Sequence, residues 1–139
     1  MQETGTTAPT SYRFWTEEKL RNADTDRQGH VNNAVIATFL ESGRIDVLDQ
    51  PPLAEVRKVT GIVVVRLLVN YRKELFFPGT VRVGTRLDRV GRTSLTFGQA
   101  VCAGDALIAD AEVTCVLVDK ATRKPVAVPE AMRAFLVGA

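Results

Sequence analysis

A single long helical pattern constrains the fold of this 139-residue chain more than any other feature. Apolar residues in segment 34–48 recur every three or four positions, as one face of an α-helix requires. Asn32 or Asn33 suits the N-cap, and Pro51-Pro52 stops the helix just past its end. The stripe expected to be buried on this helix consists of Ile36, Phe39, Leu40, Gly43 and Val47.

The rest of the chain is dominated by patterns typical of β-strands. After Gly61 the apolar residues follow a period of two, and the nearly continuous apolar run at 62–74 indicates a central strand. One amphipathic helix cannot cover both faces of a sheet, so we expect an α+β fold in which an antiparallel sheet curls around the helix. The expected order is a strand at 11–21, a loop at 22–33, the helix, a meander of four strands at 62–74, 81–88, 95–101 and 107–118, and a short helix or extended tail at 129–137.

Length and composition indicate one domain. A mass of 15.2 kDa is close to the commonest domain size, and 45% hydrophobic with 24% charged residues is ordinary for a globular protein. No repeat or linker divides the chain, so we expect a flexible N-terminus at 1–10 and a single domain at 11–139. The net charge of +2 does not argue for nucleic acid, and no apolar run is long enough to suggest a membrane partner.

Histidine and cysteine are scarce, which excludes several classes of site. His30 is the one histidine, so a zinc site built from several His and Cys ligands cannot be assembled within the chain. Any Ser-His or Cys-His nucleophile pair would have to use that imidazole. We therefore expect no metal, and no cofactor.

The two cysteines are expected to be reduced thiols. Gly104-Asp105 is a turn signal between two strand patterns, and a hairpin closed there would place Cys102 opposite Leu107 and Cys115 opposite Ser94. The two sulfur atoms would then lie roughly 25 Å apart along the strands. This separation excludes a disulfide and predicts a cytoplasmic location.

The most informative motif is NADTDRQGHVNNA at 22–34, followed by Glu41 and Arg44 on the predicted helix. It resembles the signature of the hotdog-fold acyl-CoA thioesterases of the 4-hydroxybenzoyl-CoA thioesterase type. The His-Val-Asn-Asn form is also similar to plant and bacterial acyl-carrier-protein thioesterases. The resemblance implies a hotdog fold, thioester hydrolysis, and a homodimer that assembles into a homotetramer. Asn70-Tyr71, Pro78-Gly79 and segment 91–94 match the family's strand and turn positions as well.

The motif suggests a reaction centre built on one carboxylate. By position, Asp26 is implied to be catalytic, either as the nucleophile or as the general base for water. A helix leaves its first N–H groups without internal acceptors, so the amides of Val31, Asn32 and Asn33 are expected to stabilise the oxyanion. His30 and the Asn33 side chain are grouped with Asp26 as candidate catalytic residues. A structural role for His30 is equally open.

Two further acids of this region have other interpretations. Asp24 is expected to order the loop by accepting backbone N–H groups. Glu41 pairs with Arg44 on the helix surface or serves as an alternative base.

Four arginines are candidates for binding the phosphates of coenzyme A. Arg82 and Arg86 project from one side of a strand, and Arg89 and Arg92 lie in the turn that follows. Guanidinium groups suit pyrophosphate and phosphate, although a solvated strand face would look the same. The main prediction is therefore an acyl-CoA thioesterase. An acyl-carrier-protein thioesterase and a non-catalytic acyl-CoA-binding protein are the alternatives.

Overall fold

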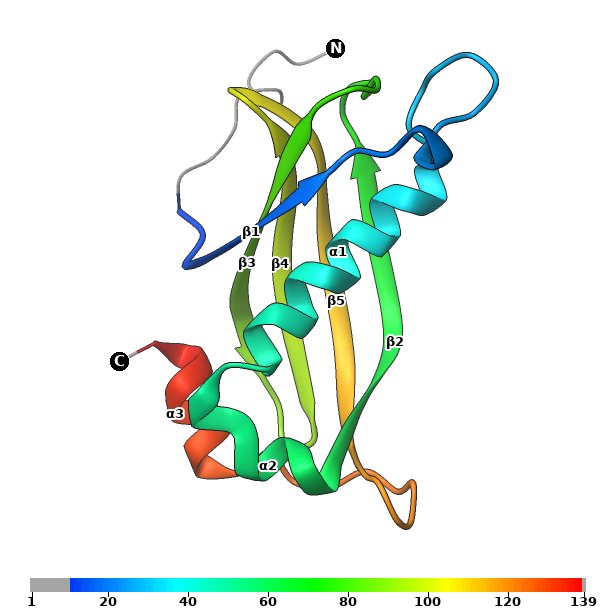
Figure 1. Cartoon of the computed structure of the whole chain (residues 1–139). Coiled ribbons are helices and arrows are strands. Elements are labelled where there is room, and N and C mark those ends of the chain that lie inside the picture. Colours follow the sequence, from blue (N-terminus) through cyan, green and yellow to red (C-terminus); the bar gives the residue numbers. More distant parts are fainter. Residues whose placement is uncertain (1–10, 139) are drawn as a thin grey trace.

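A computed structural model describes residues 11–138 of the chain (Figure 1). The expectation for residues 1–10 lies outside this range. The strands are β1 (Phe14–Lys19), β2 (Thr60–Tyr71), β3 (Thr80–Val90), β4 (Ser94–Ala103) and β5 (Ala106–Asp119). The helices are α1 (Asn33–Leu48), α2 (Ala54–Val59) and α3 (Glu130–Val137), with short 3₁₀ turns at Asn22–Asp24 and Pro51–Leu53.

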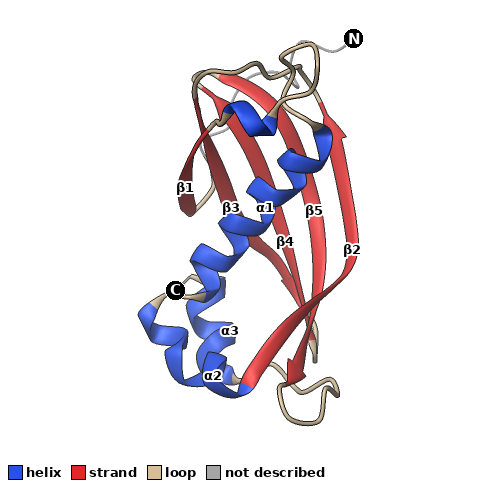
Figure 2. Ribbon diagram, turned by 45° about the vertical axis from the view of Figure 1, so that its right-hand side comes forward, coloured by secondary structure: helices blue, strands red, loops and turns tan. Residues whose placement is uncertain are grey.

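The five strands form one antiparallel sheet in the order β1-β3-β4-β5-β2. Helix α1 lies across one face of this sheet, with α2 and α3 beyond its C-terminal end (Figure 2). The expected α+β arrangement of a curled sheet around one long helix is therefore confirmed. Among residues 11–138, no helix is long and apolar enough to cross a membrane.

The position of β2 differs from the sequence-based expectation. It pairs with β5 and forms an edge of the sheet, so neither a central position nor a four-strand meander is correct. The misleading signal is an apolar run that the chain does not bury. The large apolar side chains at 63–65, 67, 68 and 71 are each at least 37% exposed.

Helix α1 agrees closely with its sequence pattern. Asn32 is the N-cap, and its side-chain oxygen accepts a hydrogen bond from the Ala34 amide at 2.8 Å. The helix ends at Leu48, and Pro51 begins a 3₁₀ turn. All five residues of the predicted stripe are buried.

Gly43 lets α1 approach the sheet closely. A Cβ atom there would lie 2.7 Å from a methyl group of Val83 and 2.9 Å from the Thr85 hydroxyl oxygen. Beside this contact the buried Gln99 amide donates to the Leu40 carbonyl and the Thr85 hydroxyl, both at 2.9 Å. The Gln99 carbonyl oxygen accepts from the Arg44 guanidinium at 3.0 Å. This network ties the middle of the helix to β3 and β4.

The cysteines lie in the β4–β5 hairpin with a register that differs by one residue from the expectation. Cys102 faces Leu107 as expected, but Cys115 faces Leu95 and not Ser94. The cause is a β-bulge between Val101 and Cys102, which shifts the pairing along the rest of the hairpin. Both cysteines are buried free thiols, and burial raises the pKa of each.

We expect Gly43→Ala to destabilise the protein by about 1–3 kcal/mol, because the new methyl group overlaps Val83 and Thr85. In an exposed helix the same change would stabilise the protein by about 1 kcal/mol. The sign of the change in unfolding free energy therefore distinguishes a closely packed position from an exposed one. Urea unfolding measures the difference. Ser42→Ala, one position earlier in the same helix, is the control and should stay within about 0.5 kcal/mol of wild type. An increase in stability for Gly43→Ala would contradict the close approach.

Candidate functional site

The motif at 22–34 folds into a 3₁₀ turn, a tight loop and the first turn of α1. Asp24 is buried, and its carboxylate accepts the Arg21 amide at 2.9 Å and the Arg21 guanidinium at 2.7 Å. These hydrogen bonds hold the pKa of Asp24 below its ordinary value. Asp24 therefore orders the entrance to the loop, as expected.

Asp26 shapes the loop with one carboxylate oxygen and leaves the other without a hydrogen bond from residues 11–138. Its Oδ1 accepts the amides of Gln28 at 2.8 Å and His30 at 3.1 Å. The Asp26 amide donates to the His30 carbonyl at 2.8 Å, which closes the loop. Since the side chain is 41% exposed, Oδ2 remains accessible.

His30 lies between two carboxylates. Its Nδ1 is 4.0 Å from Asp26 Oδ2 and 3.5 Å from Glu74 Oε2. The ring packs edge-on against Phe76, with 4.7 Å between centroids. The sequence pattern placed His30 near Asp26, but it gave no sign of Glu74. That residue follows β2 and meets His30 only because the segment after β2 returns past the loop.

The amides expected to be free at the start of α1 are not all free. The Val31 amide donates to the Leu75 carbonyl at 2.8 Å, and the Asn32 amide donates to the Asp24 carbonyl at 2.9 Å. The expectation that these two would be unpaired was therefore wrong, because tertiary partners satisfy them. The Asn33 amide has no acceptor within residues 11–138. Its carbonyl accepts the Tyr71 hydroxyl at 3.2 Å.

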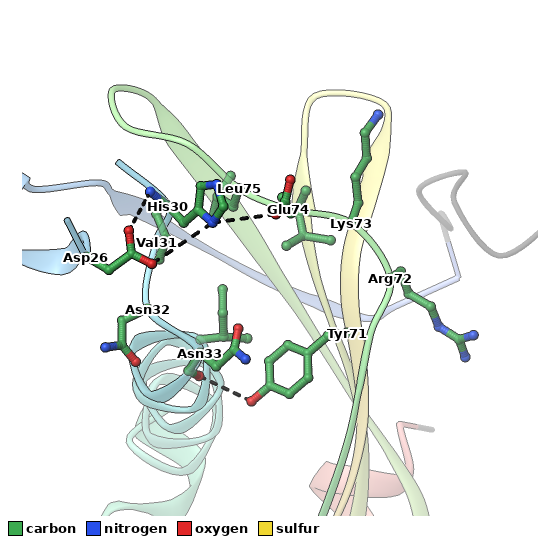
Figure 3. A pocket seen from close by; sticks show the side chains of 12 residues that line it. Asp26, His30, Val31, Asn32, Asn33, Tyr71, Arg72, Lys73, Glu74 and Leu75 are labelled. Carbon is green, nitrogen blue, oxygen red and sulfur yellow. Dashed lines mark hydrogen bonds and ion pairs between the residues drawn. The ribbon is translucent and has the colours of Figure 1, made fainter. Parts of the chain in front are cut away.

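These groups line one cavity of about 630 Å³ between the loop, the start of α1 and the segment after β2 (Figure 3). Asp26, His30 and Glu74 lie along one side, while the Tyr71 ring reaches toward Asn33. The side chains of Arg72 and Lys73 point away from Asp26. Further lining comes from Val31, Asn32, Ile36, Leu75 and Ile108.

The four predicted phosphate-binding arginines do not line this cavity. Arg82 stacks over Trp15 at 4.4 Å, and Arg86 lies over Tyr12 at 4.7 Å. Arg86 also pairs with Asp88 at 2.8 Å, which raises the pKa of its guanidinium. Arg89 approaches Glu112 at 3.7 Å, and Arg92 is exposed in the β3–β4 turn.

Glu41 lies away from Asp26, in a second cavity of about 170 Å³. This cavity is bounded by the C-terminal half of α1, by α2 and by β2. The same cavity contains Arg44, but the two side chains do not form an ion pair within 4 Å. Among residues 11–138, no three His, Cys, Asp or Glu side chains gather as a metal site.

Comparisons with known proteins identify the chain's relatives. Residues 20–136 match the thioesterase-like superfamily. The long-chain acyl-CoA thioesterase FadM of Escherichia coli K12 is 29% identical over 122 residues, which cover 85% of this chain and 92% of FadM.

Two solved structures extend the comparison. A thioesterase from Thermus thermophilus, complexed with coenzyme A and Zn, aligns with a TM-score of 0.80, 29% identity and coverage of 93% of this chain and 100% of that one. The probable thioesterase YbaW of Escherichia coli aligns with a TM-score of 0.78, 27% identity and coverage of 90% and 97%. The chain thus belongs to the thioesterase-like superfamily and is a hotdog-fold thioester hydrolase.

Proposed function

We propose that the protein hydrolyses acyl-CoA thioesters to a free carboxylic acid and coenzyme A, with Asp26 as the catalytic carboxylate. The observation that carries this proposal is that an accessible carboxylate oxygen and an unpaired amide donor line the same cavity. Asp26 Oδ2 and the Asn33 amide line the same cavity, and neither has a hydrogen-bond partner among residues 11–138. A thioester carbonyl between them would meet an attacking group and an oxyanion donor.

The roles of the neighbouring groups follow from this placement. In one route Asp26 Oδ2 attacks the carbonyl carbon, expels the CoA thiolate and forms an anhydride that water then hydrolyses. In the other, Asp26 takes a proton from water, the water oxygen attacks the same carbon, and the CoA thiolate leaves to give the free acid directly. The Asn33 amide, aided by the positive end of the α1 dipole, stabilises the oxyanion in both. His30 orients the Asp26 carboxylate from the loop side, and the Asn33 side chain shapes the mouth of the site.

Coenzyme A is the thiol carrier that the relatives favour. FadM is an acyl-CoA thioesterase, and the Thermus thermophilus thioesterase was solved with coenzyme A. Within this proposal, Arg82, Arg86, Arg89 and Arg92 hold the phosphates on the sheet surface, outside the reaction cavity. Arg86 and Arg89 lie close to acidic neighbours and Arg82 stacks over Trp15, so Arg92 is the most available of the four.

We also propose a homodimer that assembles into a homotetramer in the cytoplasm. Edge strand β2 supports the first association, because its outer backbone edge has no partner strand among residues 11–138. Val63 and Leu68, on the face turned away from α1, are also exposed to solvent. Such edges are commonly covered by a second chain. The buried free cysteines fit a reducing compartment.

Asp26→Asn should lower kcat for acyl-CoA hydrolysis by about a hundredfold or more, because the amide cannot attack the carbonyl or accept a proton from water. The asparagine Oδ1 still accepts the Gln28 and His30 amides, so the loop should keep its shape. A thiol-trapping dye measures CoA release, and thermal unfolding checks the fold. Asp105→Asn, in the exposed β4–β5 turn, is the control and should be fully active. Full activity of Asp26→Asn would remove this residue from its role.

Arg92→Ala should raise KM for acyl-CoA about tenfold with little change in kcat, because a guanidinium that only holds phosphate contributes equally to ground state and transition state. Repeating the assay with acyl-dephospho-CoA separates the 3′-phosphate from the pyrophosphate. If Arg92 binds the 3′-phosphate, the variant and wild type should have the same KM for this substrate. Lys124→Ala, another exposed cation, serves as the control. An unchanged KM for Arg92→Ala would favour a solvated strand face.

A further inference from the structure

The second cavity contains a buried guanidinium with no carboxylate partner. Arg44 is only 7% exposed, and its one hydrogen bond among residues 11–138 goes to the neutral Gln99 side chain. No Asp or Glu of the described chain lies within 4 Å of it. A buried charge without a close counter-ion is costly. Burial lowers the pKa of Arg44, although the charge of Glu41, which lies beyond 4 Å, acts in the opposite direction. This arrangement is suited to an anion that is not part of the chain.

Arg57 adds a second cation to the same cavity. It comes from α2, and its Nε is buried without a hydrogen-bond partner among residues 11–138. Its Nη1 donates to the Thr60 carbonyl at 3.2 Å, which fixes the guanidinium in place. Glu41 is the single acid that lines the cavity, and it is exposed. The remaining walls are apolar: Ile45, Leu48, Ile62 and Val64.

Apolar side chains of β2 line the sheet face between this cavity and the reaction cavity. Val64, Leu67 and Val69 of β2 pair with Cys115, Val113 and Ala111, so they lie on the sheet face that carries α1. Helix α1 begins beside the end of β2 and diverges from it toward β1 and β3 (Figures 1 and 2). Val64 and Leu67 consequently remain 43% and 44% exposed on this face.

The distance between the two cavities suits an acyl chain. At about 1.5 Å of rise per residue, Arg44 lies roughly 16 Å along the α1 axis from Asn33. With carbon–carbon bonds of about 1.5 Å in a zigzag chain, this separation corresponds to roughly ten to fourteen carbon atoms. The far cavity of about 170 Å³ has room for a carboxylate and a few methylene groups.

We propose that Arg44 and Arg57 bind a carboxylate at the far end of the acyl group, so that the preferred substrates are CoA thioesters of long dicarboxylic acids. The inference rests on the proposed function, since it places the thioester at Asp26 and Asn33. Charge-assisted hydrogen bonds from two guanidinium groups would discriminate a carboxylate from a methyl group strongly. A methyl end would leave both cations with no carboxylate within ion-pair distance among the described residues, since Glu41 lines the cavity beyond 4 Å.

The test compares CoA thioesters that differ only at the far end of the chain: methyl, hydroxyl or carboxylate. Lengths of roughly eight to sixteen carbons bracket the expected span. Wild type should show a kcat/KM at least about tenfold higher for the carboxylate end than for the methyl end at the best length. Arg57→Met should abolish this preference, while kcat/KM for the methyl-ended substrate changes less than about twofold. Arg57→Lys should retain part of the preference, because it keeps the positive charge. Lys58→Met, the adjacent exposed cation on α2, should leave all values unchanged.

The outcomes separate this inference from the proposed function. Equal rates for methyl and carboxylate ends, or equal loss on both in Arg57→Met, would overturn the carboxylate subsite while leaving acyl-CoA hydrolysis intact. A preference for hydroxyl as strong as that for carboxylate would also overturn it. Absence of hydrolysis for every thioester would overturn the proposed function, and this inference with it.

Discussion

The close contact between α1 and the sheet at Gly43 determines the rest of the structure. Because Gly43 has no side chain, the helix rests directly on Val83 and Thr85, and the Gln99 amide fastens it to β3 and β4. A helix held over these strands cannot also cover β2. The inner face of the sheet near β2 is therefore left open, with apolar side chains exposed along it.

The same placement sets the two ends of the proposed substrate path. The N-terminus of α1 lies beside the end of β2, where its cap, the Asp26 loop and the segment after β2 surround the larger cavity. Hydrogen bonds from Val31 to Leu75 and from Asn32 to Asp24 fix this end and leave the Asn33 amide as the available donor. At the other end of the open face, Arg44 is held by the Gln99 that anchors the helix. The Gln99 side chain thus anchors the helix and also holds Arg44 of the proposed carboxylate site.

Local patterns predicted the local features well. The α1 stripe, the Asn32 cap and the loop-ordering role of Asp24 depend on neighbours within a few residues, and each was visible in the sequence. The antiparallel sheet around the helix was also predicted, but several details of tertiary pairing were missed or wrong. An apolar run cannot tell a buried strand from an edge strand with an uncovered face, so β2 was misplaced. The carbonyl that accepts the Val31 amide and the Glu74 carboxylate beside His30 both come from the segment after β2, far away in the sequence. A β-bulge next to Val101 shifted the register of the strands that carry the cysteines.

The proposed chemistry requires thioester hydrolysis to occur between Asp26 and the start of α1. The most direct measurement is a crystal structure with a ketone analogue of acyl-CoA, in which a methylene group replaces the thioester sulfur and prevents cleavage. We expect the carbonyl oxygen roughly 3 Å from the Asn33 amide, with Asp26 Oδ2 facing the carbonyl carbon. An analogue whose carbonyl lies outside the cavity of Asp26 and Asn33 would contradict this placement of the reaction.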